Sequence, residues 1–431
     1  MLPILFRLTF ESLWSQLLLY AVALAVVGYI AYNGWRGAEG VMNLQGKREP
    51  VRTADRAQRA LLYGGGGAVL AWFGLKYALP PGAFPGGQGE GIPIHTYGVL
   101  LASGFFCAAS VAARLALDEW RKPQWVDGQG WVDTEGPRRR EQILDLGFWV
   151  LVGGLVGSRV LFIIVNWETY SRDWTDIFSL GGGLVFYGGL IGAALASYAF
   201  ARVHGMDFLR LADLAIPTVS LGAALGRLGC FAAGCCWGGP AMDSHLAVRF
   251  PGAGMAKDLF GRLTGTGSSA FGSQAEDSRY IIQATGEIAH QAGPGAVRIS
   301  QWVAEHGTTL PVHPTQLFES VGHLVLFVSL LWLRRFRRFH GHIFSVWLMA
   351  YAALRTTVEL FRGDAERGTL HGLLSDKAPS LAHWVPLEAW YNISTSQFIS
   401  LCMFTFGATL LYQRSKRLAE ATGLGPTPSA A

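Results

Sequence analysis

The chain has 431 residues, of which 51% are hydrophobic and only 15% are charged, and its formal net charge is +5. Soluble proteins of similar apolar content carry about a quarter of their residues as charged side chains. The missing charge leaves apolar runs long enough to span a lipid bilayer, which takes about 20 residues. The basic residues lie in short clusters between these runs, so the composition excludes a soluble protein and gives no sign of nucleic-acid binding.

The apolar segments predict an all-α polytopic membrane protein with about nine transmembrane helices. No clear small-residue cleavage site follows the first segment, so we expect it to be retained rather than removed as a signal peptide. Glu11 and Gln16 shorten this segment, and it could instead lie along the membrane interface. The expected spans are 14–33, 60–79, 94–117, 142–165, 183–203, 209–226, 313–333, 342–361 and 396–413.

The charges in the loops predict one orientation. Residues 80–91 contain no Lys or Arg, and residues 166–180 contain one basic residue, Arg172. Because basic loops stay in the cytoplasm, the alternation of basic and non-basic loops places the C-terminus in the cytoplasm. The long 241–312 segment then faces the other side of the membrane. The basic loops are 34–59, 118–140, 334–340 and 413–417.

The 241–312 segment is polar and contains two strand-like runs, HLAVRF and RYIIQAT, which predict a small extracytoplasmic head domain. The remaining boundaries follow from the spans. We expect an N-terminal extension with two spans at 1–90, a membrane core at 91–240, the head at 241–312, three last helices at 313–415 and a cytoplasmic tail at 416–431.

Charged side chains inside a span are costly, so they indicate a functional site. Arg355, Glu359 and Arg362 follow each other at i,i+4 and i,i+3 spacing and therefore share one helical face. A self-neutralising ladder explains Glu359 but leaves an excess arginine, and Arg227 adds another at the end of the 209–226 span. Arginines that converge near the outer leaflet suit a bidentate grip on a phosphate or lipid headgroup.

Other polar residues stand at the ends of spans. Tyr187 lies one turn into its span, where an interfacial aromatic belt is the alternative to a site role. Glycines 188, 189 and 192 of the same span are typical of close helix packing. His313 precedes a helix start and could transfer protons or simply lie at the surface. The candidates at two other span ends are His95 with Tyr97, and Gln316 with Glu319.

Cys230, Cys235 and Cys236 cluster in GRLGCFAAGCCWGGP, residues 226–240. A zinc site is disfavoured because structural zinc usually takes a second Cys or His pair, which is missing here. A disulfide in an oxidising compartment is a second alternative. In the third, Gly229, Gly234 and the neighbouring glycines shape a loop whose N–H groups and Arg227 bind an anion, and the cysteines fill tight space. Cys107 and Cys402 lie within apolar runs, as small core residues do.

From about residue 92 to the last span, the chain resembles the prolipoprotein diacylglyceryl transferase family. The matching blocks come in the order of the family. They are HTYGVLLASGF, DLGFWVLVGGLVGSRV, GGGLVFYGGLIGA, GRLGCFAAGCCWG with LAVRFPGAG, and HPTQLFE with YAALRTTVELFR.

The resemblance implies an inner-membrane enzyme that moves diacylglyceryl from phosphatidylglycerol to the lipobox cysteine thiol of a preprolipoprotein and releases glycerol phosphate. It implies no metal or soluble cofactor, and its partners are the lipid, the lipobox segment and the bilayer. Arg227 and Arg355 match the arginines of the family, and Tyr97 matches its tyrosine. The resemblance also implies roles in shaping the site for His313, Gln316, Glu319, Tyr351, Glu359 and Arg362. His95, Gly229, Cys230 and Gly234 are further candidates for binding the substrate.

Three positions depart from the family pattern. Cys230 stands where the family has asparagine, Cys235 where it often has an acid, and Tyr187 where it has histidine. That histidine is the family's candidate for accepting the thiol proton. The proton acceptor in this chain is therefore open between Tyr187, His95 and His313. A paralogue with another donor or acceptor, or a non-catalytic lipid-binding or redox-linked protein, remains the alternative.

Overall fold

The computed structural model describes ten stretches of the chain, and most of the residues in them are helical. The predicted spans 14–33 and 60–79 lie outside these stretches. The described residues are 4–8, 92–126, 130–133, 135–171, 183, 185–252, 267–282, 285–289, 291–362 and 394–422.

Six described helices are long and apolar enough to cross a membrane. They coincide with six of the predicted spans, so the protein is a multi-pass α-helical membrane protein. The seventh, α11 (His342–Glu359), matches the prediction at 342–361 but is less apolar because Arg355 and Glu359 lie in its last turns. The six are α3 (Thr96–Glu119), α4 (Glu135–Val165), α6 (Phe186–Val203), α7 (Phe208–Ala233), α10 (Thr315–Leu333) and α14 (Thr395–Ala421).

The remaining described elements are short. One of them, the 3-10 helix η2 (Arg334–Phe336), begins directly after α10. These elements are β1 (Ile4–Leu8), β2 (Ile92–His95), β3 (Pro123–Val126), β4 (Gly130–Asp133), α5 (Trp167–Tyr170), α8 (Ser269–Ala275), β5 (Tyr280–Ile282), β6 (Ile288–Ala289), β7 (Ala296–Arg298), α9 (Ile299–His306) and η2 (Arg334–Phe336).

The chain divides into two compact units. Among the described residues, the first contains 95–108 and those from 209 onward, and the second contains those between 109 and 208. All of the arginine and cysteine candidates lie in the first unit, and Tyr187 lies in the second.

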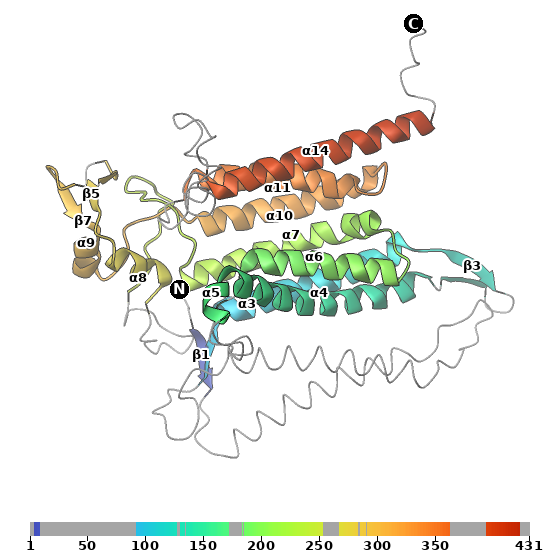
Figure 1. Ribbon diagram of the computed structural model, residues 1–431, viewed down its shortest axis with the longest axis horizontal. Coiled ribbons are helices and arrows are strands. Elements are labelled where there is room, and N and C mark those ends of the chain that lie inside the picture. The colour runs from blue at the N-terminus through green and yellow to red at the C-terminus, as the bar shows by residue number, and fades with distance from the viewer. Residues whose placement is uncertain are drawn as a thin grey trace, which may run out of the picture. The chain divides into compact units, whose positions relative to one another are not determined.

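In the first unit, α11 packs between α10 and α14 (Figure 1). The start of α11 is fixed by Asp213 of α7, a fully buried carboxylate. Its two oxygens accept the backbone N–H groups of Gly341 at 2.8 Å and Phe344 at 2.9 Å, which a helix start otherwise leaves unsatisfied. Trp347 of α11 also donates to Ser220 of α7 at 2.9 Å. These bonds hold α11 in register with α7.

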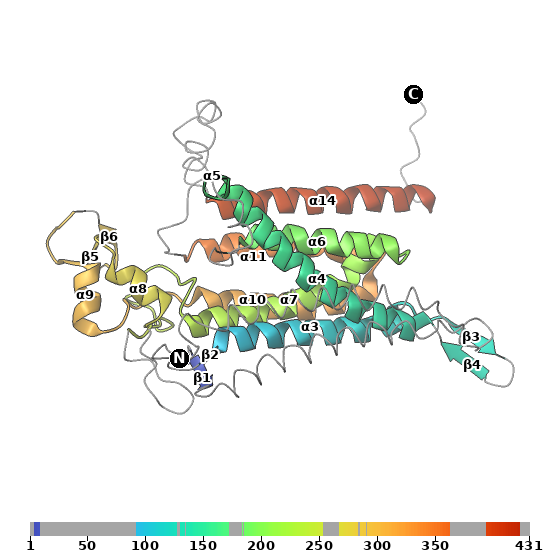
Figure 2. The same ribbon diagram turned by 60° about the horizontal axis from the view of Figure 1, so that its bottom comes forward.

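In the second unit, α4 crosses α6 obliquely (Figure 2), and glycines allow the backbones to approach. A Cβ on Gly153 would lie 2.9 Å from the carbonyl oxygen of Gly192, and one on Gly189 would lie 3.4 Å from that of Gly154. A Cβ on Gly188 would likewise clash with the carbonyl oxygen of Gly157. The prediction that these α6 glycines serve close helix packing is therefore confirmed.

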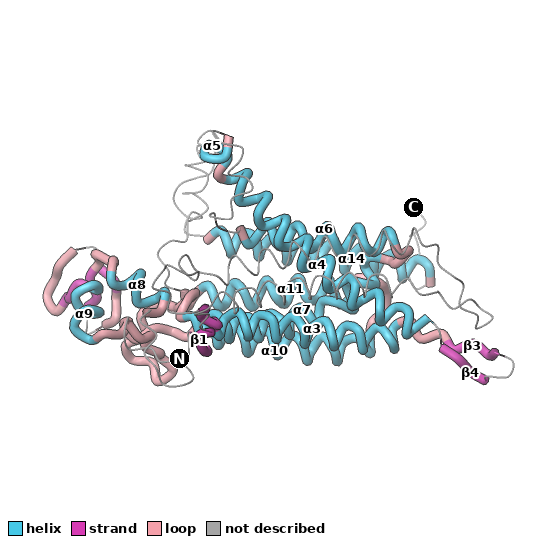
Figure 3. The backbone as a smooth tube through the Cα atoms, turned by 90° about the horizontal axis from the view of Figure 1, so that it is seen from below, coloured by secondary structure: helices cyan, strands magenta, loops and turns pink. Residues whose placement is uncertain are grey.

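The described part of the 241–312 segment contains α8 and α9 (Figure 3). It also contains a three-stranded antiparallel sheet in the order β6-β5-β7. Within the RYIIQAT run, Tyr280–Ile282 form strand β5, which confirms a strand at this place. The HLAVRF prediction is wrong, because Val248 makes only an isolated bridge with Val312 instead of a continuous ladder. Phe250, Ile281 and Trp302 form part of a buried core in this segment.

Candidate functional site

Three arginines of the first unit surround one carboxylate. Glu319 of α10 is 3% exposed, and it contacts Arg227 at the end of α7 through one of its oxygens. Its other oxygen lies 3.3 Å from Arg355 of α11 and 3.9 Å from Arg362 just beyond α11. Arg355 also pairs with Glu359 at 2.6 Å, which confirms the predicted i,i+4 contact. In the ion pairs of the described residues, three guanidinium groups face two carboxylates, an arrangement that favours the binding of an anion.

Access to this cluster is uneven. The side chain of Arg227 is 25% exposed, whereas those of Arg355 and Arg362 are 11% and 3% exposed. Arg355 donates to Ser396 of α14 at 2.9 Å, so a third helix fixes its position. Arg227 is therefore the guanidinium of the cluster that an incoming ligand can reach most easily.

The cysteine loop, residues 234–240, follows α7 and reverses the chain sharply. Gly234 has φ +66°, and a Cβ there would lie 2.5 Å from the Cβ of Ser268. Cys236 has φ +61°, which is uncommon for a residue with a side chain. Two side chains of α10 hold the loop, because Gln316 donates to the carbonyl of Cys235 at 2.7 Å and Thr315 to that of Cys236 at 2.9 Å.

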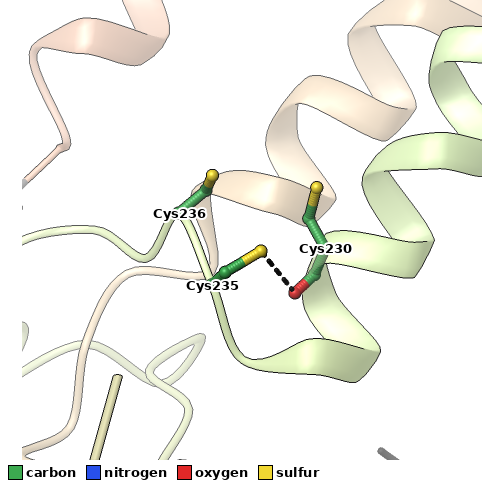
Figure 4. A group of neighbouring side chains, drawn as sticks. All are labelled: Cys230, Cys235 and Cys236. Carbon is green, nitrogen blue, oxygen red and sulfur yellow. Dashed lines mark hydrogen bonds between the residues drawn. The ribbon is translucent and has the colours of Figure 1, made fainter. Parts of the chain in front are cut away.

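This reversal brings the three cysteines together at the end of α7 (Figure 4). All three are free thiols, and their Sγ atoms lie within 4.8 Å of one another. The thiol of Cys235 also points to the carbonyl of Cys230 at 3.6 Å. Hydrogen bonds from the other two thiols lower the pKa of Cys236, and the nearby Arg362 guanidinium lowers it further. The predicted disulfide alternative is absent among these cysteines.

The residues around His313 fix its backbone beside the cysteine loop. His313 accepts from the N–H of Gly238 at 2.9 Å and donates to the carbonyl of Gly239 at 3.0 Å. Gly239 in turn donates to Phe361 at 2.8 Å, so the segment that carries Arg362 is held by the same short ladder. The imidazole of His313 packs edge-on against Phe361, with 5.4 Å between the ring centroids.

Tyr97 and the two predicted loop glycines have clear packing environments. Tyr97 is 40% exposed at the start of α3, and a Cβ on Gly229 would lie 3.1 Å from its ring. Gly229 therefore lets α7 approach α3 at the tyrosine. Gly234 faces Ser268 and Phe250 in a similarly tight space. Their predicted roles in binding stay predictions.

Two predicted residues are not brought into this cluster by the described structure. Tyr187 belongs to the second unit, where it is 46% exposed and stacks edge-on against Phe186. The side chain of His95, at the end of β2, lies outside the described part. Tyr351 lies on α11 and stacks on Trp347 with a centroid distance of 5.2 Å.

Sequence reasoning missed His323 and Ser396. His323 of α10 is 5% exposed and stacks on Tyr351, with ring centroids 5.5 Å apart. It follows Glu319 at i,i+4 spacing, which places it on the same helical face and could have singled it out. Ser396 carries no comparable signal, because its contact with Arg355 depends on how α14 packs.

Comparisons with known proteins support one family. A family model described as prolipoprotein diacylglyceryl transferase matches residues 88–413. A phosphatidylglycerol–prolipoprotein diacylglyceryl transferase of Clostridium tetani is 26% identical over 317 residues, covering 74% of this chain and 92% of the relative. The enzyme of the same name from Serratia proteamaculans is 32% identical over 288 residues, covering 66% of this chain and 83% of the relative. That from Rhodopirellula baltica is 26% identical and covers 85% and 82% of the two chains. The chain belongs to the prolipoprotein diacylglyceryl transferase family.

Proposed function

We propose that the protein transfers a diacylglyceryl group from phosphatidylglycerol to the lipobox cysteine thiol of a preprolipoprotein and releases glycerol phosphate. The observation that carries this proposal is the cluster of Arg227, Arg355 and Arg362 around the buried Glu319, where the described ion pairs set three guanidinium groups against two carboxylates. A guanidinium fork suits a phosphodiester, and burial strengthens its attraction for a negative charge.

The reaction requires a nucleophilic sulfur and a leaving phosphate. The substrate thiol loses its proton, and the resulting thiolate attacks the glycerol carbon that bears the phosphate. A C–S bond forms while the C–O bond breaks, and its electron pair stays on the phosphate oxygen. Arg227, the most exposed arginine of the cluster, stabilises the charge that develops on that oxygen. Arg355 holds the phosphate from the α11 side.

Other residues shape the site in this proposal. Tyr97 borders the substrate path from α3, and Glu359 positions Arg355 through its 2.6 Å contact. Tyr351, Gln316 and the backbone around His313 support the surrounding surface. Cys230, Gly229 and Gly234 line the loop, while the proton acceptor is one of Tyr187, His95 and His313.

The proposed topology follows the loop charges. We place the protein in the bacterial inner membrane with about nine spans, two of them in the N-terminal extension at 1–90. The cysteine loop and the 241–312 head domain face outward. The tail at 416–431 is cytoplasmic, so the reaction takes place at the outer face of the membrane, where an exported lipobox segment arrives.

Complementation tests this function. Bacterial cells depleted of their own diacylglyceryl transferase would be given this chain, and the lipid on a reporter lipoprotein would be measured by mass spectrometry. Arg227→Ala should abolish the transfer. Arg138→Ala is the matched control, because Arg138 is half exposed and pairs with Glu135 at 3.8 Å in the second unit. Full-length protein that inserts into the membrane but never modifies the reporter would contradict the proposed activity.

A further inference from the structure

Packing alone does not explain why Cys230 of α7 lies together with Cys235 and Cys236 of the loop that follows it. Packing would be served by any small side chains, yet the chain reversal at Gly234 and Cys236 brings three thiols within 4.8 Å of one another. Within the parts of the chain that the structure describes, one group of three His, Cys, Asp or Glu side chains is close enough to share a metal ion. It consists of Cys230, Cys235 and Cys236. Neighbouring thiols are suited to soft, thiophilic cations.

The geometry is close to that of a thiolate metal site. A zinc–sulfur bond is about 2.3 Å long, which puts two sulfurs of a tetrahedral site about 3.8 Å apart. The three Sγ atoms lie within 4.8 Å of one another, so a closure of about 1 Å brings them to coordination distance. Rotation about the Cα–Cβ bonds moves a sulfur that far without any change in the backbone.

Two arginines of the cluster lie beside the cysteines. Arg227 precedes Cys230 by three residues, about one helical turn, and Arg362 forms an isolated backbone bridge with Gly238, two residues after Cys236. Three thiolates and one divalent cation together carry a single negative charge. The guanidinium groups of the neighbouring arginine cluster offset part of this negative charge.

We propose that Cys230, Cys235 and Cys236 bind one thiophilic divalent cation, of which zinc is the physiological example, and that its fourth position takes the lipobox thiol. The second half of this inference rests on the proposed function. Three protein ligands with one open position are typical of catalytic rather than structural zinc sites. In this inference the bound cation, rather than Tyr187, His95 or His313, promotes the loss of the thiol proton.

The step balances without any oxidant or reductant. The incoming thiol binds the cation, its S–H bond breaks, and the proton leaves to water, because a coordinating thiol is deprotonated. The sulfur then forms a C–S bond with the glycerol carbon and leaves the cation. The C–O bond breaks with its electron pair on the phosphate oxygen beside the arginines, and the protein's three thiolates keep the cation.

Metal binding can be measured on the purified full-length protein without any lipid transfer. Cadmium is the probe, because its thiolate complexes absorb ultraviolet light and it replaces zinc in such sites. Titration should saturate at one equivalent. Cys107→Ser with Cys402→Ser should leave this unchanged, since both residues are exposed, not core residues as predicted, and neither belongs to the cluster of three. Cys230→Ser, Cys235→Ser and Cys236→Ser together should remove the absorption. Equal cadmium binding by both variants would overturn the proposal.

A thiol count on the unmodified protein guards against variants that fail to fold. Of the five free thiols, cadmium should protect three from maleimide labelling, and a chelator should release them. Fewer than five labelled thiols after the chelator and denaturation would reveal a disulfide and overturn the metal site.

The transfer assay then separates this inference from the proposed function. Chelator-treated protein should lose at least a hundredfold in transfer rate and regain it with zinc. If the triple serine variant transfers lipid normally, the metal's role in the reaction is refuted while the transferase function stands. If the protein binds cadmium but transfers no lipid in any form, the transferase function fails and only the binding site remains.

Discussion

Glu319→Gln isolates the charge that holds the arginine cluster together. The substitution keeps the shape of the side chain but leaves Arg227, Arg355 and Arg362 without the carboxylate they share. Glu319 is 3% exposed, and Arg355 and Arg362 are nearly as buried, so water cannot replace the lost charge at these two arginines. Removing one partner of a buried ion pair costs about 3–5 kcal/mol. Because Arg227 is 25% exposed and glutamine can still accept one hydrogen bond, we expect a loss near the lower end, about 3 kcal/mol.

The assay is a denaturant titration of the purified protein in mixed micelles, followed by tryptophan fluorescence. Glu420→Gln is the control, because Glu420 pairs with Lys416 at 3.9 Å while both side chains are more than half exposed. Such a surface pair contributes about 0.5 kcal/mol or less. Equal stability of the two variants would refute the view that Glu319 anchors a coupled buried network.

A second arm of the same experiment tests whether the cluster binds phosphate. Phosphatidylglycerol in the micelles should restore part of the loss in Glu319→Gln, because its phosphate supplies the missing negative charge to the three arginines. Phosphatidylcholine, whose headgroup is zwitterionic, should restore less. A variant that is destabilised but responds equally to both lipids would show that the arginines are structural and do not hold the phosphate.

Three further substitutions test the scaffold by thermal unfolding. Gly192→Leu should destabilise the second unit by about 1–3 kcal/mol, because α4 and α6 have no room for a side chain there. Gly234→Ala should cost more than Gly205→Ala: both have positive φ, but only the first would also place a Cβ against Ser268. Asp213→Ala should cost about 1–3 kcal/mol for each N–H group it strands at the start of α11, whereas Asp213→Asn, which keeps one acceptor, should cost about half as much.

The helices were predictable because a membrane span depends on the local sequence alone. A run of about 20 apolar residues is sufficient for a span, and the seven predicted spans inside the described stretches coincide with helices. The pairing of Arg355 with Glu359 was equally local, since one helical turn separates them. The α6 glycines were correctly read for the same reason, as their spacing by itself marks a packing face.

What could not be predicted depends on contacts between distant segments. Glu319 was recognised as a polar residue at a span end, but its place between three arginines follows from the packing of α7, α10 and α11. The HLAVRF run alternates like a strand, yet a strand needs a partner, and Val248 finds one at Val312 alone. The convergence of the thiols depends on the left-handed backbone of Cys236, a conformation that no pattern of residue types predicts for cysteine.

The first turn of α10 connects the two clusters physically. Thr315 and Gln316 hold the carbonyls of the cysteine loop, and Glu319 holds the arginines. Thr315 and Glu319 are four residues apart, so they lie on the same helical face and about 6 Å apart along its axis. A rotation or shift of α10 therefore moves the thiols and the guanidinium groups as one body. A substitution reaction in which a sulfur attacks while a phosphate leaves needs the thiols and the guanidinium groups at a fixed separation. The contacts of both clusters with one turn of α10 keep that separation.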